Sequence, residues 1–283
     1  MTPRVSGDPG DSARSGLFAE VLPVVITLLI ILALVAEAGG AAARRGVWFC
    51  GDFEMGGLHG WAWDRARPES IAVVTQPVRK GRYAVRVSLA PGDIAASKER
   101  AELKIGDRAI ERVRGRQGGE MWYGWSLLVP ADYADPPGEH FQILGQWHHR
   151  PAESPVKGRV AHGGGPPPLI LHLAPHDGRH VLTLIGRAFP GDPGRKLGAR
   201  PVRQGAWTDL VFHVRWSTGN DGFVEAWLDG RPFTAGKVYG PTLYSPVSNY
   251  LRLGLYRGKG FSTTNHVYYD EVRIGDSYQA VAP

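Results

Sequence analysis

The sequence has almost no cysteine and little sign of helix. Cys50 is the only cysteine among 283 residues, which excludes an intramolecular disulfide and a cluster of thiolate metal ligands. We interpret Cys50 as a structural residue near the first strand. From residue 47 onward the apolar residues show no convincing helical period, which argues against a helical bundle.

The longest uncharged apolar run, Val21 to Ala36, is also limited in length. It is short for a membrane span of about 20 residues and long for the core of a signal peptide. Two A-x-A cleavage patterns follow, at 36–38 and 41–43. We expect residues 1–43 to be a cleaved signal peptide, with an N-terminal membrane anchor as the alternative. In both cases residues 44–283 form the exported body, either secreted or periplasmic.

The body carries an excess of positive charge. Residues 1–38 contain two arginines and four acidic residues, so their removal raises the formal net charge from +6 to +8. A basic surface attracts polyanions, although a merely soluble charged surface is the alternative. For an exported monomer we expect an acidic polysaccharide as partner, no nucleic acid, and membrane contact only through the N-terminal segment.

Short runs rich in Val, Ile, Leu, Trp and Tyr recur between Gly, Pro and Asp. This pattern is typical of an all-β sandwich or jelly roll. Asp229-Gly230 indicates a hairpin turn, whereas residues 150–168 and 189–204 are interpreted as long loops. Strands are expected near 47–54, 71–75, 82–90, 99–105, 120–129, 140–148, 168–174, 180–187, 206–216, 222–229, 249–257 and 266–274.

Strand alternation predicts three polar faces, because residues two apart in a strand share a face. The first comprises Arg100, Glu102 and Lys104, and the second Gln142, Leu144, Gln146 and His148, opposite Phe141, Ile143 and Trp147. The third comprises Tyr250, Arg252, Gly254 and Tyr256, opposite three leucines. Each face taken alone is more typical of a solvated strand or of structural polar residues than of a catalytic site.

Together these residue types suit elimination at a uronic acid. Removal of the C5 proton requires a neutralised carboxylate, a base at the proton and an acid at the departing C4 oxygen. Arginine and glutamine neutralise a carboxylate, histidine or tyrosine accepts a proton, and tyrosine donates one. This chemistry requires no metal and no organic cofactor.

The three segments resemble motifs of the alginate lyases of polysaccharide lyase family seven. R-A-E-L-K from Arg100, Q-W-H from Gln146 and Y-L-R-L-G-L-Y-R-G from Tyr250 are similar to R-(T/S)-E-L-R, Q-(I/V)-H and Y-F-K-A-G-V-Y-N-Q, in the same order. With G-D-F-E at 51–54, W-Y-G-W at 122–125 and V-Y-Y-D-E-V-R-I at 267–274, the chain looks still more like the heparin-lyase-like and glucuronan-lyase-like group, over about residues 47–278.

The resemblance implies a concanavalin-A-like β-jelly-roll sandwich of two antiparallel sheets, with a substrate groove on one sheet. Arg100 and Gln146 would neutralise the carboxylate, and Tyr256 would be the acid. The role of base stays open between His148 and Tyr256. Lys104, Trp147 and the pair Arg257-Gly258 depart from the alginate-lyase pattern, which weakens alginate as the substrate. Further substrate contacts are expected from Glu102, Lys104, His172, Tyr250, Arg252, Arg257 and Lys259.

Two more sets of residues are candidates for binding. Trp122, Tyr123 and Trp125 suit sugar stacking, or else the core. Jelly-roll carbohydrate proteins often hold a structural calcium between an early acidic residue and one on the last strand. Glu54 and Asp270 are candidates for that role, with a buried salt bridge as the alternative.

Two other functions are alternatives to a lyase. A retaining glycoside hydrolase of this fold would use paired carboxylates, usually as E-x-D-x-x-E, and no such motif occurs. A non-catalytic glycan-binding module would not need Gln146, His148 and Tyr256 together. We therefore expect an exported polysaccharide lyase that cleaves a 4-linked, uronate-containing polysaccharide by β-elimination.

Overall fold

The computed structural model describes residues 1, 45–96, 98–135, 141–149, 166–244 and 246–283. The chain divides into two units, Met1–Arg45 and Gly46–Pro283, and the fold described here is that of the second. The predicted signal or anchor lies outside the described residues, as does most of the predicted loop at 150–168. No helix in the described part of the chain is long and apolar enough to cross a membrane.

The described strands form two antiparallel sheets, which confirms the predicted all-β sandwich of jelly-roll type. The nine-stranded sheet has the order β14-β13-β12-β7-β17-β4-β3, with β1 beside β17 and β15 beside β13. Its strands are β1 (Val47–Gly51), β3 (Ile71–Val74), β4 (Ala84–Leu89), β7 (Glu120–Leu128), β12 (Trp207–Arg215), β13 (Phe223–Leu228), β14 (Arg231–Pro232), β15 (Val238–Tyr239) and β17 (Asn265–Gly275).

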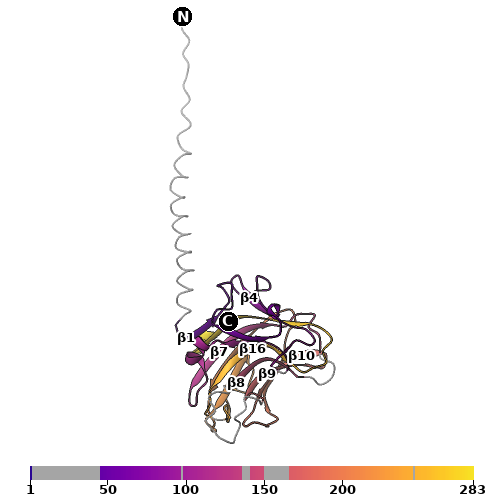
Figure 1. Cartoon of the computed structure of the whole chain (residues 1–283). Coiled ribbons are helices and arrows are strands. Elements are labelled where there is room, and N and C mark those ends of the chain that lie inside the picture. Colours follow the sequence, from indigo (N-terminus) through magenta and orange to yellow (C-terminus); the bar gives the residue numbers. More distant parts are fainter. Residues whose placement is uncertain (2–44, 97, 136–140, 150–165, 245) are drawn as a thin grey trace. The chain divides into compact units, whose positions relative to one another are not determined.

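The eight-stranded sheet has the order β11-β10-β9-β8-β16-β6-β2, with β5 beside β6. Figure 1 shows β16, β8, β9 and β10 side by side in this layer. Its strands are β2 (Trp61–Arg65), β5 (Ile94–Ala95), β6 (Lys98–Ile105), β8 (Gln142–His149), β9 (Leu169–His176), β10 (Arg179–Gly186), β11 (Arg195–Pro201) and β16 (Asn249–Arg257). The helices are η1 (Pro68–Ser70), α2 (Asp107–Val113) and α3 (Tyr278–Val281).

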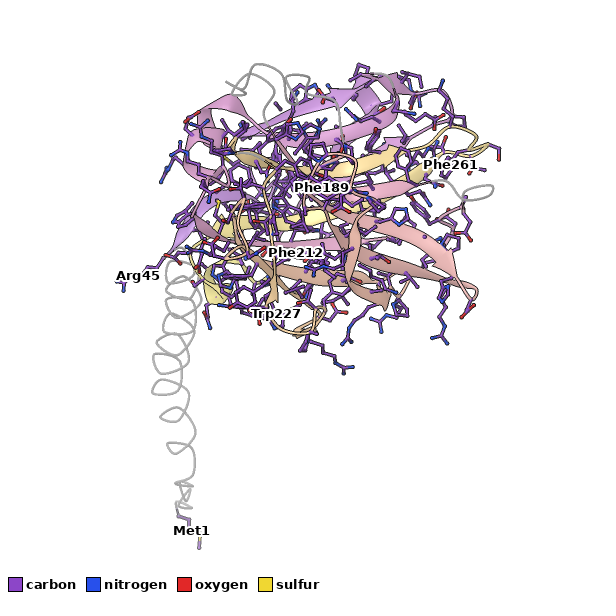
Figure 2. All side chains as sticks on the ribbon, turned by 90° about the horizontal axis from the view of Figure 1, so that it is seen from below. Met1, Arg45, Phe189, Phe212, Trp227 and Phe261 are labelled. Carbon is purple, nitrogen blue, oxygen red and sulfur yellow. The ribbon has the colours of Figure 1, made fainter. Side chains whose placement is uncertain are left out.

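Alternating apolar side chains from both sheets fill the space between them. Trp125 of β7 and Trp147 of β8 have ring centroids 5.9 Å apart, and Phe212 of β12, labelled in Figure 2, stacks on Trp125 at 4.8 Å. All three side chains are fully buried. Large aromatic side chains bury more apolar area than any others, so this cluster is a major contributor to the stability of the sandwich. The polar side chains of the eight-stranded sheet therefore lie mainly on its other face, which points away from the nine-stranded sheet.

A β-bulge in β8 changes which residues share that other face. Toward β9, Ile143 pairs with His172 and Gly145 with Leu171, so β8 has one extra residue there. Toward β16, Ile143 pairs with Tyr256 and Gly145 with Leu253, so the extra residue lies in β16. Leu144 is therefore buried in the core together with its neighbour Gly145. The Tyr269 hydroxyl lies 2.6 Å from the carbonyl oxygen of Leu144, within hydrogen-bonding distance. Bulges are known to redirect side chains in this way near active sites.

The prediction for 141–148 was accordingly right in one half and wrong in the other. Gln146 and His148 share a face, as expected. Leu144 and Gln142 instead point into the core, and Ile143 points out with the polar set, because strict alternation fails at the bulge.

Other differences concern short or polar elements. β11 lies within the segment interpreted as a loop. It was not predicted because its sequence, R-K-L-G-A-R-P, carries no apolar alternation and the strand is defined only by its pairing with β10. β2 and the seven-residue helix α2 were also not predicted. The hairpin at Asp229-Gly230 is confirmed: both residues have positive φ, of 50° and 71°, between β13 and β14.

Candidate active site

The face of the eight-stranded sheet that points away from the nine-stranded sheet, here called the site face, gathers the predicted residues into rows. Residues directly opposite on neighbouring strands have Cβ atoms about 5 Å apart. One row is Arg100, Tyr256, Ile143, His172 and Thr183, and a second is Lys104, Arg252, Gln146, Ile170 and Ile185. His148 lies opposite Tyr250. Five strands thus bring together side chains more than 150 positions apart in sequence.

Glu102 is at the centre of the charged part of the site face. Its carboxylate lies 3.0 Å from Nε of Arg100 and 3.1 Å from Nη2 of Arg252, and it accepts a hydrogen bond from Nε2 of Gln146. Only 1% of the Glu102 side chain is exposed. A buried carboxylate is stable only when it is paired and hydrogen-bonded in this way. Glu102 therefore orients Arg100 and Gln146, and its burial leaves little of it for substrate contact.

Asp64 of β2 extends this network and was missed from the sequence. Its Oδ1 accepts a hydrogen bond from Nζ of Lys104 at 2.8 Å, and its Oδ2 accepts one from Nη2 of Arg252. Burial raises the pKa of the Asp64 carboxyl, but the Lys104 hydrogen bond and the Arg252 charge outweigh it and hold the pKa below its usual value. Asp64 is therefore an anion that fixes two cations. Its place beside Glu102 follows only from the pairing of β2 with β6, which the sequence did not predict.

His148 is held as a neutral imidazole. Burial lowers its pKa to about 4, and the charges of Arg252 and Arg100 act in the same direction. Its Nδ1 lies 2.8 Å from the carbonyl oxygen of His149. Because a carbonyl only accepts, Nδ1 carries the proton and Nε2 keeps its lone pair. The side chain is thereby prepared to accept a proton or a hydrogen bond.

Tyr256 and Arg100 form a stacked pair. The Arg100 guanidinium carbon is 4.1 Å from the centroid of the Tyr256 ring, and Phe141 contacts the same ring edge-on at 5.1 Å. Stacking of this kind fixes the ring and leaves the phenol hydroxyl at its free end. Within the described residues, the two Nη atoms of Arg100 have no hydrogen-bond or ion-pair partner. Both groups are positioned to meet a ligand on the site face.

The remaining predicted contacts differ in position. His172 lies on the site face opposite Thr183, and burial, followed by the charge of Arg187, lowers its pKa. Tyr250 has its ring centroid 6.1 Å from that of His148. Lys259 is exposed in the turn after β16, and no described contact connects it with the site-face residues.

Arg257 is placed differently from the prediction. Its side chain is fully buried on the core side of β16, where Nε pairs with Oε2 of Glu99 at 2.8 Å. Its guanidinium carbon lies 4.0 Å from the ring centroid of Phe261, which is labelled in Figure 2. Alternation explains this, since the residue after Tyr256 must point to the opposite face. Arg257 is thus a structural residue and contacts no substrate on the site face.

Glu54 and Asp270, the residues of the predicted calcium site, both hold backbone N–H groups, and calcium binding stays a prediction. The Glu54 carboxylate accepts hydrogen bonds from the backbone N–H groups of Arg82 and Tyr83, and Asp270 accepts them from Arg79 and Lys80. Among the described residues, no group of three or more acidic, histidine or cysteine side chains is arranged to hold a metal. These carboxylates instead fix the loop before β4.

The tryptophan-rich segment of β7 lies in the other sheet. Tyr123 and Trp125 are buried in the core, and the Trp122 ring stacks on His213 at 4.0 Å. Since β7 is part of the nine-stranded sheet, none of the three faces the candidate site, and the prediction of sugar stacking for them is wrong.

Several solved structures share this fold. An endo-β-1,4-glucuronan lyase from the fungus Trichoderma reesei matches with a TM-score of 0.60 and 22% identity, over 84% of this chain and 98% of that chain. An alginate lyase from Pseudomonas aeruginosa gives 0.52 and 16%, over 75% and 87%. The catalytic domain of a glycoside hydrolase family 131 protein from Coprinopsis cinerea gives 0.52 and 13%, over 79% and 86%. At these identities the similarity establishes the fold alone.

Sequence comparison assigns the family. A search of curated protein sequences found no match. The sequence model of the family described as Polysaccharide lyase matches residues 53–273, which include all the described strands of the site face and every residue of the Glu102 network. The motif order, the site geometry and this match agree, and the chain belongs to the polysaccharide lyase family.

Proposed function

We propose that this lyase cleaves a 4-linked, uronate-containing polysaccharide by β-elimination on the site face. The observation that carries the proposal is that Arg100, Gln146, His148 and Tyr256 share the site face on three neighbouring strands, with Arg100 and Gln146 held by the buried carboxylate of Glu102. These four side chains supply the carboxylate ligands, the base and the acid that the reaction needs.

Neutralisation of the substrate carboxylate comes first. The Nη atoms of Arg100 and the second amide hydrogen of Gln146 bind it, because Glu102 uses only Nε of Arg100 and one amide hydrogen of Gln146. Charge-assisted hydrogen bonds to the carboxylate stabilise the enolate that develops when C5 loses its proton. Glu102 keeps both donors in place throughout the reaction.

Proton transfer then breaks the glycosidic bond. Nε2 of His148 accepts the C5 proton, the C5–H electron pair forms the C4=C5 double bond, and the C4–O bond breaks toward the leaving oxygen. The Tyr256 hydroxyl protonates that oxygen, and proton exchange with solvent restores both groups. The lone pair on Nε2 follows from the Nδ1 contact with the His149 carbonyl. The products are a new chain end and an unsaturated uronate.

Hydrolysis is less well supported by the same residues. A retaining hydrolase needs one protonated carboxyl as acid and one free carboxylate as nucleophile. Glu102 is buried between two arginines, and the Lys104 hydrogen bond and the Arg252 charge keep the pKa of Asp64 low. Neither carboxyl is therefore suited to donate a proton at neutral pH.

The substrate is tested with a panel of uronate polymers. Glucuronan is the first choice, since the structural relative from Trichoderma reesei is a glucuronan lyase and Lys104 departs from the alginate-lyase motif. The purified protein is incubated with glucuronan, alginate, heparin and hyaluronan while the ultraviolet absorbance of the unsaturated uronate is followed. Absorbance with glucuronan is expected. Binding without products would indicate a glycan-binding module instead.

The proposed location is outside the cytoplasm, with residues 1–43 acting as a cleaved signal and the body as a monomer. The A-x-A patterns at 36–38 and 41–43 support cleavage. N-terminal sequencing of the protein recovered from the culture medium or periplasm should begin near residue 39 or 44. Intact residues 1–43 in a membrane fraction would favour the anchor.

A further inference from the structure

A third row of residues crosses the site face and ends at Arg187. Tyr250 of β16 lies opposite His148 of β8. The register of β8 with β9, and of β9 with β10, continues this row to Pro168 and then to Arg187, the residue that follows β10. The backbone N–H of Arg187 donates to the carbonyl oxygen of Pro168 at 2.7 Å, so the pairing extends to this residue. Arg187 is therefore in line with His148, two strands or about 10 Å away.

The Arg187 side chain lies on the site face. It is two positions beyond Ile185, a member of the second row, and residues two apart share a face. Gly194, which precedes β11, confirms this: a Cβ added there would lie 2.5 Å from Cγ2 of Ile185 and 3.4 Å from Nε of Arg187, so these two side chains run next to each other. Burial and then the charge of Arg187 lower the pKa of His172, a member of the first row. Arg187 therefore points to the surface that carries the candidate catalytic groups.

Arg187 differs from the cations of the Glu102 network, each of which pairs with a carboxylate. Among the described residues Arg187 forms no ion pair, and its side chain makes one hydrogen bond, from Nη1 to the carbonyl oxygen of Pro167 at 3.2 Å. The nearby carboxylate of Asp192 instead accepts the backbone N–H groups of Ala188 and Gly194, each at 2.8 Å. Nε and Nη2 of the half-buried Arg187 are therefore available to an anionic ligand.

We propose that Arg187 binds the carboxylate of a second uronate residue, in the same polysaccharide chain whose C5 proton His148 removes. A chain that crosses the strands along the third row passes from His148 over Pro168 to Arg187. Two strand spacings exceed the length of one sugar ring, so the two carboxylates belong to different sugars. A planar guanidinium with free N–H groups is well suited to a carboxylate. This inference rests on the proposed function and adds to it a specificity for polymers that carry a further uronate beyond the reacting one.

The test compares two arginines of the same strand face in the full chain. Arg187→Gln should raise KM for glucuronan about fivefold, the effect expected of one half-exposed charge pair. The loss falls in KM because a contact away from the reacting atoms is equal in the ground and transition states. Arg187→Lys keeps the charge and should recover most of the loss. Arg179→Gln is the matched control: Arg179 begins β10 on the same face, about 26 Å from Arg187, and should behave as the parent protein.

Two further readouts identify the contact as an ionic one with a distant sugar. The Arg187→Gln effect should shrink as salt rises, and it should be smaller on the shortest oligosaccharide that is cleaved, since a chain held at His148 alone does not reach Arg187. Equal losses for Arg187→Gln and Arg179→Gln, or no recovery by Arg187→Lys, would overturn the subsite while the lyase activity stands. If the parent protein cleaves no uronate polymer, the proposed function itself fails, and the subsite fails with it.

Discussion

The two halves of the site face differ in charge. Toward β2, the strands β6 and β16 carry Arg100, Glu102, Lys104 and Arg252, with Asp64 beside them. Toward β11, the strands β9 and β10 contribute Ile170, His172, Thr183 and Ile185. His172 adds no charge at neutral pH, because burial lowers its pKa. A single surface thus joins an ion-paired half to a half whose four central side chains are uncharged, called the uncharged half; Arg179 and Lys196 lie at its margin, on β10 and β11.

This difference in charge suits the two halves to different tasks, catalysis in the charged half and binding of the polymer in the other. In the charged half, Glu102 and Asp64 fix the cations in place, as stabilising the negative charge of an enolate requires. In the uncharged half, the side chains offer surface without ion pairs, so they suit binding of the polymer more than its chemistry. The consequences of substitution should therefore be large in the first half and small in the second.

The largest effect is expected at the junction of the two halves. Tyr256→Phe removes the proposed acid and should lower kcat by about a thousandfold, within the range for general acid catalysis, while binding of glucuronan is retained. Absorbance of the unsaturated product and calorimetry measure the two quantities. Full activity of this variant would show that another group protonates the leaving oxygen.

Glu102→Gln tests whether the charged half is a cooperative network. Removal of the charge leaves the buried Arg252 with Asp64 alone, which should reduce the free energy of unfolding by about 3 kcal/mol. Glu120→Gln is the control, because Glu120 pairs with Arg215 on the other sheet but is 45% exposed, and should cost less than about 1 kcal/mol. Urea denaturation compares them. Equal losses would argue against a special role for Glu102.

The pH profile of kcat/KM reports the state of His148. Above its pKa of about 4 the imidazole is neutral and Nε2 accepts a proton, whereas protonation at lower pH turns Nε2 into a donor. Activity should therefore stay level as the pH falls from neutral and decline only as it passes through about 4. A decline centred near 6.5, the ordinary pKa of histidine, would contradict the buried neutral state.

The smallest effects should separate the two halves most clearly. Lys104→Met removes one cation of the charged half and should lower kcat/KM about tenfold, as for loss of a charge-assisted hydrogen bond. Thr183→Val, a change of similar shape in the uncharged half, should alter it by less than about twofold. Steady-state kinetics on glucuronan test both. Similar losses in the two variants would remove the distinction.

The sequence predicted the part of the site that depends on local alternation. Arg100, Glu102 and Lys104 lie on one unbroken strand, and so do Tyr250, Arg252 and Tyr256, so period-two reasoning placed them correctly. It failed at Leu144, because a bulge depends on pairing with two neighbouring strands and on the distant Tyr269 hydroxyl.

Long-range pairing explains the other misses. Asp64 belongs to a short strand with no motif, and its role arises only because β2 pairs with β6. Arg257 resembled a substrate ligand because it follows Tyr256, yet its partner Glu99 lies 158 residues away on the core side. Partners of buried charges cannot be deduced from local sequence alone.

Elimination itself is tested most directly by cleaving glucuronan in water labelled with the heavy oxygen isotope and weighing the products by mass spectrometry. Elimination adds no water, so new non-reducing ends should be unsaturated uronates, and the reducing ends released by C4–O cleavage should contain no label beyond that of a pre-formed oligosaccharide incubated alongside. The Tyr256→Phe variant should give neither product. Saturated ends with one labelled oxygen per cleavage would show hydrolysis and contradict the account.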